Sequence, residues 1–296
     1  MRLRSRVHLL ALLLSLVIPL SGCGRATLQP FVVAAVPWQD GEVSEYDVLD
    51  ASGAVIGSAA WTWQGVSEGW NLTYVLILGA REDGAEVLLG QDLAPIRSRL
   101  TYPGASHEAT YGEEHIAIVT TRDGDRATQD LRRPDTPIDN SQTLQTHRAL
   151  PLAEGYATQY TNVIPSTGSM ATTQVHVVGA ETLTTAAGTF ATWRVELRTG
   201  QIRHDAWYAQ DAPHLLIQYH NRRAGSQLRL RRWQPEAGAA WQSAPPGAAK
   251  EVPLAADAMP GLDRGRHRDL ALAGLLVIAK TREPGAEITT HSETAT

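Results

Sequence analysis

The stretch "WRVELRT", from Trp193 to Thr199, alternates apolar and polar side chains. In a strand, Trp193, Val195 and Leu197 would lie on one face, and the charged residues between them would lie on the other. Alternation of this kind, with one apolar face, is typical of an antiparallel sheet that is buried on one side and solvated on the other. The stretch therefore predicts a β-strand in a sheet with a single covered face.

Short runs typical of strands continue through the middle of the chain. In "IRSRLTY" the residues expected to share one face of a strand are Ile96, Ser98, Leu100 and Tyr102. The stretch "LTYVLIL" (72–78) is apolar except for its threonine, and we expect a central strand covered on both faces. Between such runs stand "DASG", "EDGAE", "RDGD" and "RRAGS", whose Asp and Gly residues tolerate the positive φ angles of hairpins. The predicted fold is all-β and antiparallel.

Two parts of the chain share a weak order of motifs. In each part a strand precedes a Gln-Asp pair, a proline follows, and the next strand ends in a tyrosine; the pairs are Gln91-Asp92 and Gln210-Asp211. A sheet built from two similar halves would give this repeat, and so would chance similarity among short strands. We expect a β domain at 42–235, with halves at about 42–125 and 156–235 and a crossover at 126–155.

The chain begins with a basic segment that leads into an apolar one. Arg2, Arg4 and Arg6 precede an almost wholly apolar run that ends at Leu20. This arrangement is typical of an export signal, and the run is too short for a lasting membrane span, which needs roughly 20 apolar residues. We therefore predict a signal peptide at 1–22, followed by a tether at 23–41.

The last part of the chain, 236–296, is rich in Ala, Pro and Gly without a period. It contains one short apolar run, "DLALAGLLVIA" (269–279). We expect a low-complexity tail that is disordered or holds one short helix. A helix that binds a partner or touches a membrane is the alternative.

The apolar run near the start of the chain ends in "LSGC", which contains Cys23, the only cysteine. This pattern resembles the lipobox of bacterial lipoproteins, in which the thiol is joined to a diacylglyceryl group. A buried thiol or a redox site is the alternative, and neither suits a single cysteine directly after an export signal. We therefore predict lipidation of Cys23, with acyl chains of the palmitate type that anchor the protein in a membrane. The anchor would lie in the outer membrane facing the periplasm, or at the outer face of the plasma membrane in a bacterium with one membrane.

The charge of the chain argues against one class of partner. The formal net charge is −5 at pH 7, and loss of a basic signal peptide would make it more negative. Proteins that bind nucleic acid need a basic face. We therefore expect no nucleic-acid partner.

Three stretches together carry a resemblance to a known family. They are "HRALPLAEGY" (147–156), "VVGAETLTTAAGTFATWRVEL" (177–197) and "DAWYAQDAPHLLIQY" (205–219). Their turn-and-strand motifs resemble those of a bacterial envelope family called domain of unknown function 3108, over about residues 46–233. The resemblance implies an exported protein with a strongly curved sheet or open barrel, and it implies no activity. One departure is His214, where the family commonly has a further apolar residue, which leaves the register of that strand open.

A search for catalytic motifs finds none that specifies a reaction. His204 and Asp205 are adjacent along a predicted strand and should point to opposite faces. The other histidines lack the short spacings of zinc sites, and the motifs of serine hydrolases, zinc proteases and phosphate-binding loops do not occur. We expect no catalytic residue, no metal ligand and no cofactor.

Tryptophan is unusually frequent, with 8 Trp against 2 Phe. One hypothesis is an aromatic lining on the concave side of the sheet that holds an acyl chain or a glycan. The alternative is an ordinary core filled with large rings. The candidate ligand-binding residues are Trp61, Trp63, Trp70, Trp193 and Trp207.

Functions of different classes remain open at this point. The first is a non-enzymatic envelope lipoprotein that binds a hydrophobic ligand or an envelope protein. The second is a hydrolase of envelope polymers, and the third is a structural or assembly lipoprotein. An unbroken apolar groove would favour the first function, as a carrier of a hydrophobic ligand. Convergent carboxylates with a histidine would favour the hydrolase. A filled interior favours the structural protein.

Overall fold

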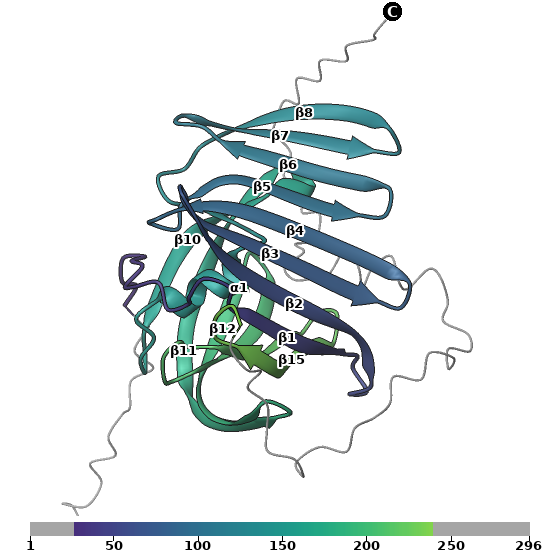
Figure 1. Cartoon of the computed structure of the whole chain (residues 1–296). Helices are drawn as coiled ribbons and strands as arrows, with labels where there is room; N and C mark the ends of the chain where they lie inside the picture. The colour runs from purple at the N-terminus through teal and green to yellow at the C-terminus, as the bar shows by residue number, and fades with distance from the viewer. Residues whose placement is uncertain (1–26, 239–296) are drawn as a thin grey trace, which may run out of the picture.

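The computed structural model describes residues 27–238, which form one sheet of 15 strands (Figure 1). The strands are β1 (Val43–Leu49), β2 (Val55–Val66), β3 (Gly69–Leu78), β4 (Arg81–Gly90), β5 (Pro95–Tyr102), β6 (Ala105–Tyr111), β7 (His115–Arg122), β8 (Asp125–Arg132), β9 (Pro137–Asp139), β10 (Ala157–Ile164), β11 (Ser169–Thr185), β12 (Gly188–Thr199), β13 (Ile202–Ala209), β14 (Leu216–Asn221) and β15 (Ser226–Gln234). The predicted all-β class is confirmed. The predicted signal peptide, Cys23 and nearly all of the predicted tail lie outside the described residues.

Helical structure is confined to short segments within residues 27–238. These are the helix α1 (Thr143–Thr146) and the 3₁₀ turns η1 (His147–Ala149) and η2 (Pro165–Thr167). In this part of the chain no helix has the length and hydropathy needed to cross a bilayer. All three segments lie in connections between strands.

The sheet consists of two meanders that meet at their first and last strands. Its order is β8-β7-β6-β5-β4-β3-β2-β1-β15-β14-β13-β12-β11-β10-β9. Neighbouring strands are antiparallel throughout, except that β9 and β10 are parallel. Because β1 pairs with β15, the start and the end of the β domain lie side by side in the middle of the sheet. Strands β8 and β9 are therefore its two ends.

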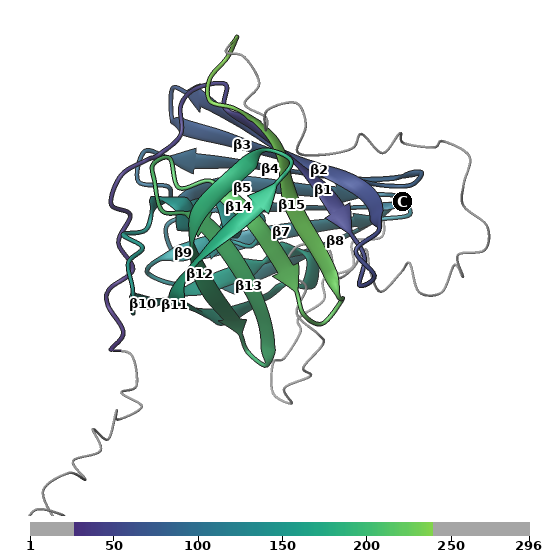
Figure 2. The same cartoon turned by 90° about the horizontal axis from the view of Figure 1, so that it is seen from below.

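The sheet curls until one end packs against the inside of the other, which gives a barrel-like section (Figure 2). Near β9, the hydroxyl of Tyr111 on β6 donates to the buried carboxylate of Asp139 at 2.6 Å. Val163 on β10 joins a small apolar cluster with residues of β6 and β7. Since β8 and β9 do not pair, side chains rather than backbone hydrogen bonds close the barrel. The predicted curved sheet or open barrel is confirmed.

Strand β12 has the alternation that "WRVELRT" predicts. Val195 and Leu197 are fully buried against the main core, and Trp193 packs partly buried beside them. Arg198 is exposed, and Arg194 and Glu196 are half-buried on the opposite face. The side chains of Val195 and Leu197 define the inner face of the sheet.

Two predictions about strand faces are wrong. We expected β3 to be covered on both faces, but Ile77 is 42 % exposed. The sheet is a single layer at β3, so only one of its faces is turned to the interior. We also expected Ile96 to share the buried face of β5, but it is 37 % exposed. Leu88 and Leu89 of β4 pair with Arg97 and Pro95, so Ile96 is the extra residue of a bulge in β5, which displaces it from the inner face.

The described strands differ from the expected domain boundaries in two places. Strands β8 and β9 lie in the stretch 126–155, where we expected a crossover. The expected tether, 23–41, contains residues that pack on the body from Gln29 onward. Gln29 forms a parallel bridge to Thr158, and Trp38 is 4 % exposed within the main core. Trp38 lies only a few residues before β1, so its ring can reach the core although this part of the chain forms no strand.

Candidate functional site

Trp61, Trp63 and Trp70, three of the five predicted tryptophans, lie inside the curl of the sheet, where Trp61 contacts Tyr46 and Tyr74. Trp61 and Trp63 on β2 are each 1 % exposed. Trp38 stacks on Trp63 with ring centroids 3.7 Å apart and an angle of 8° between the planes. Trp70 on β3 meets Trp38 and Trp63 edge-on, at 6.2 and 6.3 Å. Because the rings pack directly against one another, Trp61 and Trp63 form part of a packed core rather than the wall of an open groove.

The tryptophan core is not held together by hydrogen bonds of its indole N–H groups. The indole N–H groups of Trp38, Trp61 and Trp63 are buried and have no acceptor among the described residues. A buried donor without an acceptor costs about 1–3 kcal/mol. Burial of three large aromatic rings, with their stacked and edge-on contacts, outweighs that cost.

The other two predicted tryptophans lie apart from this cluster. Trp193 is partly buried on the inner face of β12. Trp207 pairs with Arg194, so it points to the outer face of β13. There the guanidinium of Arg194 lies 5.8 Å from its ring centroid, and its indole N–H donates to Glu181. The five tryptophans therefore do not form a single lining.

A short polar segment is buried inside the barrel between the two meanders. This segment, residues 142–149, includes α1 and η1 and is called the plug below; Figure 1 shows α1 within the curl of the sheet. Every residue of the plug is 2 % exposed or less. Gln142 donates to the carbonyl of Leu93 in the β4–β5 turn at 3.0 Å. Arg148, at the other end of the plug, reaches the β13–β14 turn.

Arg148 has all of its hydrogen-bond donors satisfied although it is 1 % exposed. It forms a two-point ion pair with the buried Glu42, with N–O distances of 2.6 and 3.1 Å. It also donates to Gln145 at 3.0 Å and twice to the carbonyl of Pro213, at 3.3 and 3.2 Å. A guanidinium has five N–H donors, and these contacts use them all. Its carbon lies 5.5 Å from the ring centroid of Trp38.

The plug joins the two turns that carry the repeated Gln-Asp pairs. Gln91-Asp92 lies in the β4–β5 turn and Gln210-Asp211 in the β13–β14 turn. Both turns contain a residue with positive φ outside glycine, Leu93 at 63° and His214 at 53°. Both are followed by a strand with a bulge, at Ile96 in β5 and at Ile217 in β14. His214 therefore lies in the turn, and the open question of register is answered because β14 begins at Leu216.

His147 in the plug is also fully buried. Its ring nitrogens lie 3.2 Å from the hydroxyl of Tyr208 and 3.0 Å from that of Tyr160. Burial lowers the pKa of His147 to about 3. The imidazole is therefore neutral at physiological pH, and it serves to connect the plug to β10 and β13.

Sequence reasoning missed the role of the plug. Arg148 stands in the "RALPL" motif that carries the family resemblance, but Glu42 is 106 residues away in the chain. A charged residue inside an otherwise apolar motif was the available signal, because a charge at such a position needs a partner. Nothing in the local sequence around Glu42 marks it as that partner.

His204 and Asp205 point to opposite faces, as predicted. His204 is buried on the inner side, with its Nδ1 at 2.9 Å from the hydroxyl of Tyr219. Asp205 lies on the outer side and accepts hydrogen bonds from Arg222 and Arg194. Burial raises the pKa of Asp205, but the two guanidinium groups outweigh this effect and hold it below its usual range. The pair is not a catalytic dyad.

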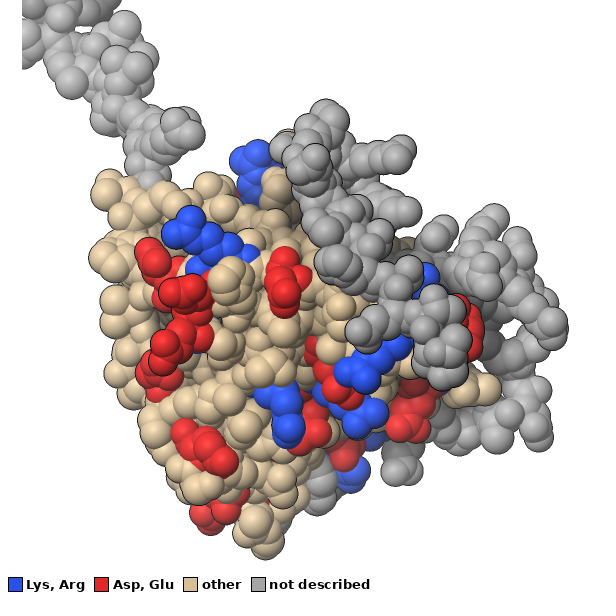
Figure 3. Space-filling model, turned by 90° about the horizontal axis from the view of Figure 1, so that it is seen from above, with Lys and Arg blue, Asp and Glu red and all other residues tan. Residues whose placement is uncertain are grey.

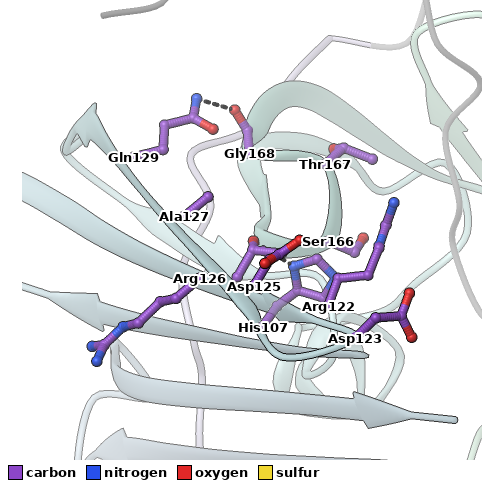
Figure 4. A pocket seen from close by; sticks show the side chains of 11 residues that line it. His107, Arg122, Asp123, Asp125, Arg126, Ala127, Gln129, Ser166, Thr167 and Gly168 are labelled. Carbon is purple, nitrogen blue, oxygen red and sulfur yellow. Dashed lines mark hydrogen bonds between the residues drawn. The ribbon is translucent and has the colours of Figure 1, made fainter. Parts of the chain in front are cut away.

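An open pocket of about 460 Å³ lies between the β7–β8 hairpin and η2 (Figure 4). His107 on β6 reaches it, with its Nε2 2.7 Å from the hydroxyl of Tyr102 and its Nδ1 2.9 Å from Oγ1 of Thr120. Burial and then the charge of Arg122 lower the pKa of His107. The side chain of Gln129 on β8 donates to the carbonyl of Gly168 at 2.7 Å and joins the two walls.

The pocket is polar, but it does not contain the parts of a hydrolytic site. Its remaining lining residues are Arg122, Asp123, Asp125, Arg126, Ala127, Ser166 and Thr167. Both ring nitrogens of His107 are already hydrogen-bonded within the sheet, so the imidazole is not free to act as a base toward a nucleophile. Acidic and basic groups are mixed, so the pocket favours no ligand of a single charge.

The described residues, 27–238, contain no cluster of three or more His, Cys, Asp or Glu that could hold a metal ion. The face of the molecule at the β8 side shows acidic and basic residues scattered among uncharged ones (Figure 3).

These features define a class of protein: a single-sheet, open β-barrel with an aromatic core and a buried polar plug. The family model described as "Protein of unknown function (DUF3108)" matches residues 34–223, and the chain belongs to this family. The search of curated proteins gives no match.

Solved structures from three bacteria are similar to the chain at low identity. One is a β-barrel-like protein of the domain of unknown function DUF1849 from Brucella abortus, with 11 % identity, a TM-score of 0.45, and coverage of 66 % of this chain and 96 % of that chain. A candidate exported protein with a YmcC-like fold from Bacteroides fragilis has 12 % identity, a TM-score of 0.27, and coverage of 68 % and 99 %. A candidate lipoprotein from Parabacteroides distasonis has 10 % identity, a TM-score of 0.26, and coverage of 69 % and 100 %.

Proposed function

We propose that the chain is a lipid-anchored, non-enzymatic protein of the bacterial cell envelope that binds another envelope protein through its outer surface. The observation that carries this proposal is the filled interior of the barrel. A carrier of acyl chains or glycans needs an open concave site, and a typical site encloses about 300–1,000 Å³. Here the concave side is occupied by the stacked rings of Trp38 and Trp63 and by the plug.

The plug argues most strongly against a ligand inside the barrel. The ion pair of Arg148 and Glu42 lies in the interior, with every donor of the guanidinium satisfied by the chain itself. An apolar ligand that displaced the plug would leave two buried charges without partners, which is costly. The outer surface is the part of the body that remains for recognition.

The open pocket near His107 does not favour the hydrolase. His107 is engaged at both ring nitrogens, and the arginines and aspartates of the β7–β8 hairpin mix both signs. The same pocket suits a polar loop of a protein partner, since charges of both signs and hydroxyl groups can each find a complement there.

The place of the protein in the cell rests on the start of the sequence. A basic and then apolar segment leads to "LSGC" and to Cys23. Two acyl chains on that cysteine would give stable membrane attachment without a protein span. The acidic net charge of the chain gives no electrostatic attraction to anionic lipid, so the covalent anchor would supply the attachment.

Labelling of cells with radioactive palmitate tests the anchor. The full chain should take up label and fractionate with membranes, whereas the Cys23→Ser variant should take up none and lose the membrane fraction. An unlabelled native chain, or a variant that remains in membranes, would overturn the anchor.

Native mass spectrometry of the full chain, purified from its own membranes, tests the mode of action. We expect the mass of the acylated chain with no further lipid or glycan held in a stoichiometric amount. One bound hydrophobic molecule per chain would instead support the carrier. In-cell photo-crosslinking from the outer face should then capture a distinct envelope protein, and capture of none would contradict surface binding.

A further inference from the structure

Strand β8 presents a free edge at one end of the sheet. It pairs with β7 along its whole length, and none of the other described strands pairs with its second side. Its residues are exposed except for Leu131, which is half-buried. A free edge of eight residues is a template for the addition of another strand, because its outward N–H and C=O groups are unpaired.

The register of the β7–β8 hairpin shows which backbone groups face outward. Arg122 is opposite Asp125, so the hairpin loop consists of Asp123 and Gly124. At the far end of the hairpin, the N–H of Arg133 donates to the carbonyl of Glu114 at 2.7 Å. Hydrogen-bonded pairs alternate along an antiparallel ladder, so the odd-numbered residues of β8 bond to β7. Its even-numbered residues direct their N–H and C=O groups to the free edge: Arg126, Thr128, Asp130 and Arg132.

The charges on these even-numbered positions are complementary under a two-fold rotation. We propose that β8 pairs antiparallel with β8 of a second copy of the chain, about an axis that passes beside Thr128. In that register Thr128 lies opposite Thr128 of the second copy, and Arg126 lies opposite Asp130, twice. The hydrogen-bonding groups of both edges then meet in phase. No ion pair within the described residues already uses Arg126 or Asp130.

Neighbouring registers with the same hydrogen-bond phase lose both attractive pairs. A shift of two residues in one direction places Arg126 opposite Thr128. Shifts in the other direction bring like charges together, first Arg126 opposite Arg132 and then Asp130 opposite Asp130 of the second copy. Like charges directly opposite one another destabilise a strand pair. The charge pattern therefore selects one register, in which both outward-facing pairs attract.

This contact is separate from the anchor at Cys23, and it shares Arg126 with the pocket proposed above for an envelope partner. It is a small interface, so we expect it to be weak in dilute solution. Two chains anchored in one membrane would meet at a high local concentration, which favours such a contact.

Disulfide trapping on the full, membrane-anchored chain tests the register. In the proposed pair the two Thr128 Cα atoms are about 5.5 Å apart, within the range that a disulfide spans. Thr128→Cys should give a disulfide-linked dimer on mild oxidation. Arg132→Cys is the matched control, because it is exposed on the same face of β8 but lies far from its counterpart. No dimer from Thr128→Cys, or equal dimer from both variants, would overturn the proposal.

Charge exchange tests the same contact without a new cysteine elsewhere on the chain. In the Thr128→Cys background, Arg126→Asp should lower the trapped dimer about tenfold, because both attractive pairs become repulsive. Asp130→Arg should have the same effect, and the double exchange R126D/D130R should restore the dimer. Unchanged trapping in the single variants, or no recovery in the double variant, would overturn the proposal. Circular dichroism melting of each variant checks that the fold is kept, as exposure of both residues leads us to expect.

Discussion

Strands β8 and β13 have the same length but opposite surroundings. Each contains eight residues in an antiparallel ladder. Seven of the residues of β13 are buried, including Asp205 and Trp207 on its outer face, whereas β8 has none. Backbone pairing alone therefore does not make a strand part of the core. What separates the two is their distance along the sheet from the plug and the tryptophan core.

The buried polar groups follow the same division. Near the plug, Arg148 and Glu42 form an ion pair with both side chains 2 % exposed or less. Near the free edge, Arg99 and Glu108 form a pair at 3.4 Å with both side chains more than half exposed. In a buried ion pair, removal of one partner leaves the other charge buried and uncompensated, which strongly destabilises the fold.

The largest effect should come from the tryptophan core. Trp63→Ala removes a ring that stacks on Trp38 and leaves a void, so it should lower the free energy of unfolding by about 4–5 kcal/mol. Trp193→Ala, on the half-buried end of β12, should cost about 1–2 kcal/mol. Urea unfolding followed by far-ultraviolet circular dichroism measures both. Similar costs for the two variants would contradict a packed aromatic core.

The plug should give the next largest effect. Arg148→Met keeps much of the side-chain volume but leaves Glu42 buried without its partner, so we expect a loss of about 3–4 kcal/mol. The control is Arg99→Met, which breaks the exposed pair with Glu108 and should cost at most about 1 kcal/mol. The same unfolding experiment applies. An equal loss of stability in both variants would contradict the greater importance of the buried ion pair.

The buried histidines should make the protein less stable in mild acid. An unfolded histidine takes up a proton near pH 6.5, whereas burial lowers the pKa of folded His147 to about 3 and that of His204 to about 4. Below pH 6.5 the unfolded chain therefore binds more protons, and stability falls as the pH falls through this window. At pH 5 we expect His147 alone to account for about 2 kcal/mol of the loss.

The His147→Gln variant isolates this contribution. Its stability at pH 7 should be lower, but the decrease between pH 6.5 and pH 5 should be smaller than in the native chain by about 2 kcal/mol. Unfolding curves at several pH values measure the slope. An unchanged slope would mean that His147 is not held neutral by burial.

The smallest effect should come from the free edge of β8. The N–H of Thr128 faces away from β7, so Thr128→Pro removes no hydrogen bond within one chain and should cost at most about 1 kcal/mol. Gln129→Pro removes a bond to β7 and the contact with Gly168, so it should cost more and should release β8. Hydrogen exchange of β7 amides distinguishes the two. A larger effect at Thr128 would contradict the assigned hydrogen-bond phase.

The sequence predicts the strands well where one face alone is covered. Alternation in "WRVELRT" places Val195 and Leu197 correctly, because the inner face of this strand packs on the core and its outer face is in contact with water. The prediction that both faces of β3 are covered fails at Ile77, because an apolar side chain on an exposed face looks the same in the sequence as a buried one. The prediction fails again at Ile96, because this residue is the extra one of a bulge in β5 and the alternation changes phase there.

The interior was less accessible to sequence reasoning than the strands. Trp38 stands in a stretch without periodicity, so nothing in its surroundings indicates that it stacks on Trp63. Arg148 and Glu42 are 106 residues apart and meet only because β1 lies at the centre of a curled sheet. Side-chain contacts of this kind depend on the curvature of the whole sheet, which no single stretch encodes.

Hydrogen exchange of the plug tests the central claim most directly. The amides of Gln145 and Thr146 donate to the carbonyl of Gln142, and the barrel buries all three residues. If the interior is a permanent core, these amides exchange as slowly as those of β13, through unfolding of the whole domain. If the plug opens to admit a ligand, its amides exchange about a hundredfold faster than those of β13, and the account of a filled interior is contradicted.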